Sequence, residues 1–217
     1  MLKGIRYDVK AILDRDPAAR NSLEVFLLYP GLWAVIWHRP ANFLYRHHLK
    51  FLARWISQTV RFFTGIEIHP GAKIGRGLFI DHGMGVVVGE TTVIGNDCTL
   101  YQGVTLGGTG KETGKRHPTL GNNVMVGSGA KVLGPFSVGD NSKIAAGAVV
   151  LNEVPPNSTC VGVPARVVKC EGQKIGQDLD QVTIPDPVSS QMCTLSVHIA
   201  NLEKKLKELE EKLNEDI

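Results

Sequence analysis

Residues 120–150, LGNNVMVGSGAKVLGPFSVGDNSKIAAGAVV, carry an aliphatic side chain at every sixth position. The same spacing occurs earlier in the chain, in two registers that begin at Ile68 and at Val88. A six-residue period matches neither the 3.6-residue repeat of an amphipathic helix nor the alternation of a half-buried strand. It indicates hexapeptide repeats. The repeated aliphatic residues are Ile68, Ile74, Ile80, Val86, Val88, Ile94, Leu100, Leu106, Leu120, Val126, Val132, Val138, Ile144 and Val150.

This repeat predicts an all-β domain, a parallel β-helix, over residues 65–170. Three six-residue units would close one turn of a triangular coil, with the aliphatic side chains pointing inward. Glycine directly follows the aliphatic residue at several turns, for example at Gly121 and Gly127, and would allow the chain to bend there. The spacing by itself does not give the handedness of the coil.

One segment interrupts the repeat between its two registers. Residues 107–118 read GGTGKETGKRHP and are rich in glycine and basic residues. Such a segment cannot sit within a regular coil, so we predict that residues 108–118 loop outward. The composition suits an anion-binding or active-site loop, but taken alone it favours an ordinary solvated turn.

Residues 1–64 lack the six-residue period and look helical. Asp16-Pro17 is interpreted as an N-cap followed by the first helical residue. The dense apolar residues from 23 to 63 predict two or three helices, separated at Pro30-Gly31 and at Pro40. We expect this N-terminal helical domain to pack on itself and on neighbouring subunits.

The C-terminal part divides into a linker and a helix. Residues 171–191 are polar and contain Pro185 and Pro187, which is typical of a linker. Residues 192–217 predict an amphipathic, coiled-coil-like helix with a short tail, which would associate with copies of itself. The alternative is a solitary helix lying on its own subunit. The heptad residues are Met192, Leu195, Ile199, Leu202, Leu206, Leu209 and Leu213.

Composition limits the class of protein. The chain has 217 residues, 43% of them hydrophobic, and a net charge of +3, which is too small to indicate nucleic-acid binding. The N-terminus is charged, and the most apolar stretch, 25–36, is interrupted by Pro30, so neither export nor a membrane span is expected. The four cysteines form no Cys-x-x-Cys pair and are expected to be free thiols in the cytoplasm.

Seven short motifs occur between residues 5 and 170: RDPA (15–18), GIEIHP (65–70), IDH (80–82), VGET (88–91), GVTLGGTGK (103–111), KRHP (115–118) and GVPAR (162–166). In this combination and order the chain resembles the serine acetyltransferases. The resemblance implies that the β-helix is left-handed. It also implies transfer of acetyl from acetyl-CoA to the hydroxyl of L-serine, the first step of cysteine biosynthesis.

The reaction needs a general base, because the hydroxyl of serine is a poor nucleophile near neutral pH. Histidine, with an ordinary pKa of about 6.5, suits that task, and His82 is the candidate. A carboxylate on the other ring nitrogen would fix the tautomer. The resemblance places that carboxylate at Glu67, where the family carries Asp, and makes His117 a further catalytic candidate near the hydroxyl.

Serine is a zwitterion, so its pocket should offer a cation to the carboxylate and an acid to the ammonium. Arg116 is the candidate for the carboxylate. The resemblance adds Asp81 and Asp16 on the ammonium side, and it places Glu90 and His117 in the same substrate site.

Acetyl-CoA binds in the resembled family along the groove between adjacent solenoids, against the extended loop and the last coils. Backbone N–H groups of a glycine-rich coil would stabilise the oxyanion. We expect no metal and no prosthetic group, with acetyl-CoA as co-substrate only. The implied acetyl-CoA residues are Gly108, Thr109, Lys111, Ala146, Gly147, Pro164, Ala165 and Lys169.

A site between solenoids requires a homotrimer, and the resemblance leaves open a hexamer built through the helical domains. It also implies L-cysteine as a feedback inhibitor that occupies the serine pocket. The chain ends at Ile217, which matches the terminal isoleucine through which family members dock into O-acetylserine sulfhydrylase.

Three alternatives remain at this point. The first is a hexapeptide acetyltransferase that acts on a sugar or antibiotic hydroxyl, which would have no need of Arg116 and Asp81 together. The second is a β-helix carbonic anhydrase with zinc held by three histidines, but His69, His82 and His117 lack the close pairing we associate with that family. The third is a non-catalytic scaffold, which the Asp-His and Arg-His-Pro motifs disfavour.

Overall fold

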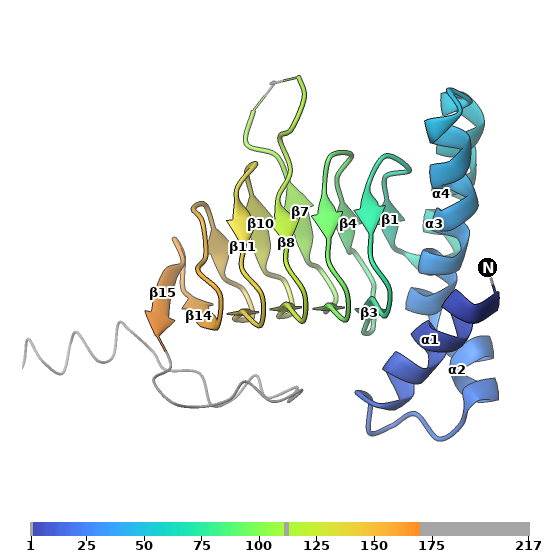
Figure 1. The fold of residues 1–217 in the computed structure, drawn as a ribbon, viewed down its shortest axis with the longest axis horizontal. Helices are drawn as coiled ribbons and strands as arrows, with labels where there is room; N and C mark the ends of the chain where they lie inside the picture. The colour runs from blue at the N-terminus through green and yellow to red at the C-terminus, as the bar shows by residue number, and fades with distance from the viewer. Residues whose placement is uncertain (1, 111–112, 170–217) are drawn as a thin grey trace, which may run out of the picture. The chain divides into compact units, whose positions relative to one another are not determined.

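The structure, a computed structural model, describes residues 2–110 and 113–169 (Figure 1). In these residues, α1 (Leu2–Leu13), α2 (Ser22–Leu28), α3 (Pro30–Arg46) and α4 (Lys50–Thr64) precede a series of short strands. The predicted linker 171–191 and the predicted helix 192–217 lie outside the described residues. The strands are β1 (Glu67–Ile68), β2 (Lys73–Ile74), β3 (Phe79–Ile80), β4 (Val87–Val88), β5 (Val93–Ile94), β6 (Thr99–Leu100), β7 (Thr105–Gly107), β8 (Thr119–Leu120), β9 (Met125–Val126), β10 (Lys131–Leu133), β11 (Ser137–Val138), β12 (Lys143–Ile144), β13 (Val149–Val150), β14 (Ser158–Val161) and β15 (Arg166–Lys169).

Successive strands join three different sheets. Sheet A has the order β1-β4-β7-β10-β13, sheet B has β2-β5-β8-β11, and sheet C has β3-β6-β9-β12-β14-β15. Neighbouring strands are parallel, except that β15 runs antiparallel to β14. The chain therefore winds as a three-sided coil with one sheet on each side, which is the predicted parallel β-helix (Figure 1).

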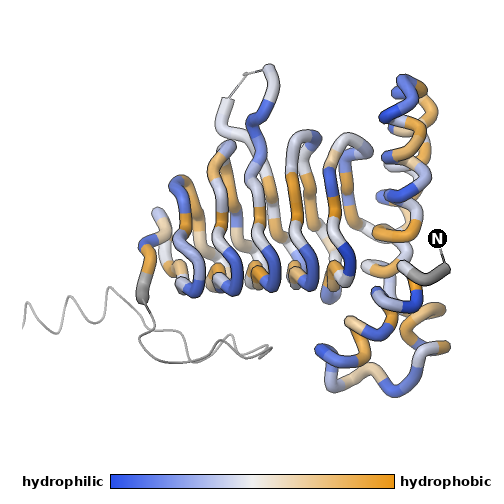
Figure 2. The backbone as a smooth tube through the Cα atoms, viewed as in Figure 1, coloured by the Kyte–Doolittle hydropathy of each residue, from blue (hydrophilic) through white to orange (hydrophobic). Residues whose placement is uncertain are grey.

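The aliphatic residues of the repeat fill the inside of this coil. All of them are buried except Ile74, which is half-buried and packs against the same cluster. Equivalent residues stack in adjacent coils, so that Ile68 pairs with Val88 and Val88 with Leu106. Figure 2 shows these hydrophobic positions recurring from coil to coil. Burying each such side chain contributes roughly 1.5–3 kcal/mol.

The corner at which the chain passes from sheet B to sheet C, the B–C corner, carries a ladder of amides. Asn123, Asn141 and Asn157 have φ values of 54°, 58° and 55°, a left-handed conformation that asparagine tolerates better than most residues. The Asn123 side chain donates to that of Asn141 (3.0 Å), which donates to that of Asn157 (3.1 Å). These bonds hold successive coils in register at the B–C corner.

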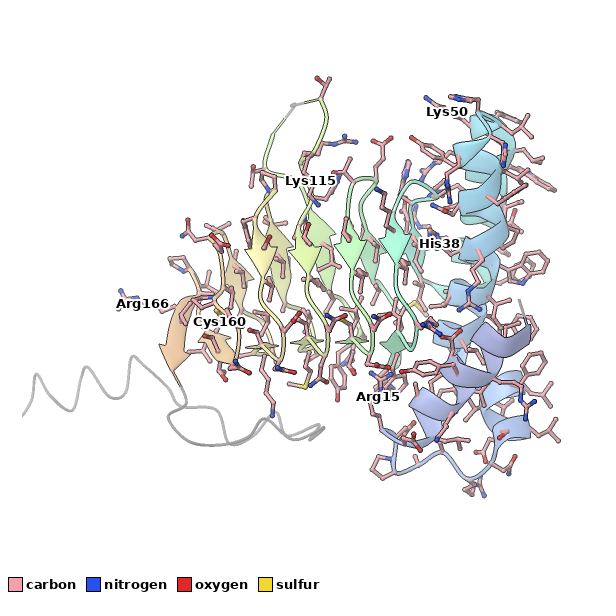
Figure 3. All side chains as sticks on the ribbon, in the orientation of Figure 1. Arg15, His38, Lys50, Lys115, Cys160 and Arg166 are labelled. Atoms are coloured by element: carbon pink, nitrogen blue, oxygen red, sulfur yellow. The ribbon has the colours of Figure 1, made fainter. Side chains whose placement is uncertain are left out.

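The helices close the first end of the coil through polar contacts as well as packing. The Arg15 guanidinium is buried and donates to the carbonyls of Asp97 and Cys98, each at 3.0 Å, and to that of Gly77 (Figure 3). The buried Asp8 carboxylate accepts from the Gly77 backbone N–H at 2.9 Å. Side chains from α1 and from the turn that follows it therefore satisfy backbone groups of the first two coils.

Two details of the helical domain differ from the sequence prediction. Asp16 does not cap a helix; its side chain accepts from the backbone N–H of Ala18 in a turn, and α2 is capped instead by Asn21. Pro40 does not separate two helices, because it lies inside α3, whereas Pro30 occupies the first turn of that helix as predicted. None of the helices among the described residues is long and apolar enough to cross a membrane.

Helix α3 lies close against the backbone of the coil at Gly31. A Cβ atom at this position would lie 2.2 Å from the Ile80 carbonyl oxygen. Because this oxygen belongs to the backbone, relieving the overlap would require the strand or the helix to shift. We predict that Gly31→Ala lowers the free energy of unfolding by about 2 kcal/mol, because overpacking outweighs the helix propensity gained. Denaturant unfolding followed by circular dichroism measures this change.

Gly110→Ala is the matched control for that substitution. A Cβ atom at Gly110 would have no heavy atom within 4 Å, so its unfolding free energy should change by less than about 0.5 kcal/mol. Equal effects of the two substitutions would contradict the assigned contact between α3 and β3.

Candidate active site

The predicted site residues occupy two corners of the coil. The C–A corner, where the chain passes from sheet C to sheet A, holds Asp81 and His82 between β3 and β4. The A–B corner, where it passes from sheet A to sheet B, holds Glu90 and, one coil later, the loop 108–118.

The C–A corner is widened at His82. Ile68 pairs with Val88, twenty residues further along, whereas Val88 pairs with Leu106, eighteen residues further along. The two additional residues lie in the turn between β3 and β4, where His82 has a φ of 58°. The His82 side chain is 74% exposed, so its imidazole can be reached by a ligand outside the coil.

Two carboxylates gather near this imidazole. His82 Nε2 lies 3.9 Å from the Asp81 carboxylate. Burial raises the pKa of Asp81, while His82 lowers it and the neighbouring Asp16 raises it further. Asp16 comes from the turn after α1 and accepts a hydrogen bond from the Tyr29 hydroxyl at 2.6 Å. The structure thus brings Asp16, Asp81 and His82 together, and it adds Tyr29, which the sequence analysis did not identify.

The predicted pairing of Glu67 with His82 is not made in the described chain. The Glu67 carboxylate lies 3.0 Å from Arg61 and 3.5 Å from Arg54, and it accepts from Gln58 at 3.4 Å. These three residues lie on one face of α4, because positions four and seven residues apart share a side of a helix. Since α4 lies against β1, its basic face takes up the carboxylate, a contact between domains that the repeat could not reveal.

At the A–B corner, the Glu90 carboxylate already has two partners. It forms an ion pair with Arg116, and it accepts a hydrogen bond from the Tyr45 hydroxyl of α3. These hydrogen bonds, that of Tyr45 first and that of Arg116 second, lower the pKa of Glu90 to about 2. Glu90 therefore orients the guanidinium of Arg116, whereas the sequence analysis had made it a substrate ligand.

His117 lies beside Arg116 and is buried against the backbone of the preceding coil. It is 9% exposed, and a Cβ atom added at Gly89 would lie 1.9 Å from its ring. Burial lowers the pKa of His117, and the nearby Arg116 lowers it further. Only glycine at position 89 leaves room for this imidazole.

Four of the predicted acetyl-CoA residues lie at the same two corners. Gly108 and Thr109 begin the loop at the A–B corner, whereas Ala146 and Gly147 lie at the C–A corner between β12 and β13. Pro164 and Ala165 lie in the turn after β14, where the Ala165 N–H donates to the Val149 carbonyl at 2.8 Å. Lys111 and the side chain of Lys169 lie outside the described residues.

The two groups of site residues are separated by one side of the coil. A six-residue side at about 3.3 Å per residue spans roughly 20 Å. No hydrogen bond or ion pair among the described residues joins Asp16, Asp81 or His82 to Arg116 or His117.

The zinc alternative required three histidines in one place. His69 lies at the A–B corner together with His117, whereas His82 lies at the C–A corner. Within residues 2–110 and 113–169, no three His, Cys, Asp or Glu side chains are grouped so that they could hold a metal ion.

The contacts of Glu90 predict a pH-dependent contribution to stability. Because its pKa is lowered from 4.5 to about 2 in the folded chain, its contacts stabilise the fold above pH 4.5 and are lost as the pH falls towards 2. We predict that Glu90→Gln lowers the melting temperature at pH 6, and that its difference from the unsubstituted chain shrinks between pH 4.5 and 3. Thermal unfolding at several pH values tests this, with the exposed Glu153→Gln as control; a constant difference would refute it.

Comparisons with known proteins agree with this architecture. The family model described as bacterial transferase hexapeptide (six repeats) matches residues 117–152. The serine acetyltransferase of Bacillus subtilis (strain 168) is 54% identical over 211 residues, which cover 97% of this chain and 97% of that protein.

Two solved structures extend the similarity to the fold. The crystal structure of Neisseria gonorrhoeae serine acetyltransferase in complex with serine is 44% identical, with a TM-score of 0.74, covering 77% of this chain and 68% of that chain. A serine acetyltransferase in complex with cysteine is 43% identical, with a TM-score of 0.81, covering 84% and 72%. These neighbours and the hexapeptide family support the predicted left-handed β-helix with helices at its N-terminal end. The chain belongs to the serine acetyltransferase family.

Proposed function

We propose that this chain transfers the acetyl group of acetyl-CoA to the hydroxyl of L-serine, which yields O-acetyl-L-serine and CoA in the first step of cysteine biosynthesis. The observation that carries the proposal is the division of charge between the two corners. At one corner Asp81 lies beside His82, with Asp16 close to Asp81, and Arg116 and His117 lie at the other corner. A zwitterion that bears a hydroxyl needs both groups.

His82 acts as the general base in this proposal. It accepts the hydroxyl proton as the serine oxygen attacks the thioester carbonyl carbon, which gives a tetrahedral oxyanion. The oxyanion then collapses, the carbon–sulfur bond breaks, and the CoA sulfur leaves with the proton from the imidazolium. The Asp81 carboxylate, 3.9 Å from Nε2, favours the imidazolium while it exists.

The serine ammonium would bind at Asp16 and Asp81, and its carboxylate at Arg116. A single serine cannot span the roughly 20 Å between the two corners of one chain. We therefore propose a homotrimer in which the C–A corner of one subunit faces the A–B corner of the next. A closed ring with head-to-tail contacts uses each corner once per subunit and forms three equivalent sites. Four of the acetyl-CoA candidates divide in the same way, with Gly108 and Thr109 at the A–B corner and Ala146 and Gly147 at the C–A corner.

Two further partnerships follow from the same pocket and from the tail. L-cysteine resembles serine and would inhibit by occupying its site, and one neighbouring structure is a serine acetyltransferase in complex with cysteine. Docking of Ile217 into O-acetylserine sulfhydrylase remains a proposal, because residue 217 lies outside the described residues. Cys98 and Cys160 are free thiols, which supports a cytoplasmic location.

The helical domain offers a surface for the hexamer that the sequence left open. An apolar groove of about 660 Å³ is lined by exposed side chains of α2, α3 and α4 that include Leu28, Trp55 and Phe63. A stable interface buries at least about 1,000 Å², and exposed apolar side chains of the same helices are available to extend the contact beyond the groove. We propose that a second trimer of the same chain covers it. Light scattering would give six times the chain mass of 23.6 kDa, and three times that mass would refute the hexamer.

The activity is tested by thiol release from acetyl-CoA with L-serine, L-threonine, homoserine, galactosides and chloramphenicol as acceptors. We predict release with L-serine alone, and a loss of at least a hundredfold with His82→Ala because the base is removed. Release with a sugar or with chloramphenicol would instead favour the alternative acetyltransferase and overturn the serine proposal.

The shared site is tested by mixing two inactive variants, His82→Ala and Arg116→Ala, through dissociation and reassembly. About a quarter of the interfaces would then pair an intact C–A corner with an intact A–B corner, so about a quarter of the activity should return. If each site lay within one chain, no activity would return. As a control, the double variant mixed with unsubstituted chain should give about a quarter for a shared site and about half for a site within one chain.

A further inference from the structure

Thr91, at the A–B corner, forms hydrogen bonds with each of the residues 115–117, the segment that contains Arg116 and His117. Its hydroxyl oxygen accepts from the backbone N–H groups of Arg116 at 3.0 Å and of His117 at 3.1 Å. Its backbone carbonyl accepts from the Lys115 ammonium at 2.8 Å, at the base of the loop (Figure 3). Thr91 therefore holds the backbone of Arg116 and His117 and the side chain of Lys115.

The same threonine also contacts the imidazole of His117. The Thr91 backbone N–H lies 3.2 Å from His117 Nδ1 in hydrogen-bonding geometry, and the Thr91 hydroxyl lies 2.9 Å from the same nitrogen. A backbone N–H can only donate, so Nδ1 must be the acceptor. The hydroxyl uses its two lone pairs for the backbone N–H groups, which leaves its hydrogen for Nδ1. Two donors thus converge on Nδ1, and the ring proton must lie on Nε2.

The surroundings of His117 favour this neutral form. The ring is buried beside the cations Arg116 and Lys115, both of which disfavour a second positive charge, and Glu90 is the acid that opposes them. Glu90, however, is occupied by Arg116 and Tyr45. Protonating Nδ1 would break the hydrogen bond from a backbone amide inside a buried corner. Nε2 has no hydrogen-bond partner among the described residues and is left to donate to a ligand.

We propose that Thr91 is a positioning residue that holds His117 as a neutral imidazole protonated on Nε2, and that His117 donates this hydrogen bond to an oxygen of the bound amino acid without taking up a proton. The proposal rests on the proposed function for the identity of the ligand. It leaves His82 as the single base of the site. The sequence analysis placed His117 in the substrate site near the hydroxyl, as both a catalytic and a binding candidate, and this assignment makes it a fixed donor.

The tautomer is measured directly by nuclear magnetic resonance on the full-length protein labelled with ¹⁵N-histidine, with His117→Gln used to assign the resonance. We expect a proton on Nε2 and none on Nδ1 from about pH 6 to pH 8, the range in which an ordinary histidine with a pKa of about 6.5 changes its charge. A proton on Nδ1, or an imidazolium at pH 7, would overturn the proposal. This readout does not depend on turnover, so failure of the serine assay would overturn the proposed function and leave the tautomer assignment standing.

Donation by Nε2 is tested by replacing His117 with two amide side chains of different length, Gln and Asn. The amide nitrogen of Gln can take the place of Nε2, whereas that of Asn takes the place of Nδ1. We expect His117→Gln to keep kcat/KM for serine within about tenfold, and His117→Asn to lose about a hundredfold, which corresponds to the loss of one buried hydrogen bond to a charged group. Equal losses with both variants, together with loss of one limb of the pH profile, would mean that His117 transfers a proton.

The positioning role of Thr91 is tested by substituting it, and Thr92→Val is the matched control. The Thr92 hydroxyl is buried and has no hydrogen-bond partner within residues 2–110 and 113–169, so its removal should change neither activity nor the tautomer. Thr91→Val should lower kcat/KM about tenfold and move the titration of His117 to higher pH, while Thr91→Ser should restore both. An unchanged His117 titration in Thr91→Val would overturn the positioning role.

Discussion

The stacking of one aliphatic side chain upon another, coil after coil, is the constraint on which the rest of this structure depends. Leu100 pairs with Val126 in the next coil, and Ile80 pairs with Leu100 before it, so each turn sets the register of the following one. Because the buried positions fix the residue spacing along each side of the coil, additional residues are confined to the corners. The widened turn at His82 and the loop 108–118 are both additions at corners, and both carry candidate site residues.

The helical domain contributes side chains to both corners of the coil that carry site residues. Arg15 and Asp8 fasten it to the backbone of the first coils, and this attachment brings Asp16 beside Asp81 and Tyr45 beside Glu90. Each half of the proposed serine site therefore contains contributions from both domains. The same attachment explains Glu67, whose carboxylate is held by α4, so that in the described chain the nearest carboxylate to His82 is that of Asp81.

Electrostatics divides the work between the two corners. At the C–A corner, burial raises the pKa of Asp81 while the imidazole of His82 stays open to solvent. At the A–B corner, Arg116 is already paired with Glu90, and His117 is buried with its Nδ1 occupied. The first arrangement suits a group that exchanges protons, and the second suits groups that bind an anion and stay fixed.

The sequence by itself determined the β-helix, its interior residues and the position of the loop, because a six-residue aliphatic period has no other regular structural solution. It also supplied the family and most candidate residues, since those lie in short contiguous motifs such as Ile80-Asp81-His82 and Lys115-Arg116-His117-Pro118. Only the tertiary structure decided which of these side chains meet. The decisive contacts join segments 9 to 45 residues apart in the sequence. They supply the partners Tyr29, Tyr45 and Thr91, give Glu90 its role, and hold the Glu67 carboxylate against α4. Hydropathy patterns do not encode such contacts, because the pattern reports burial and not the direction in which a polar side chain points.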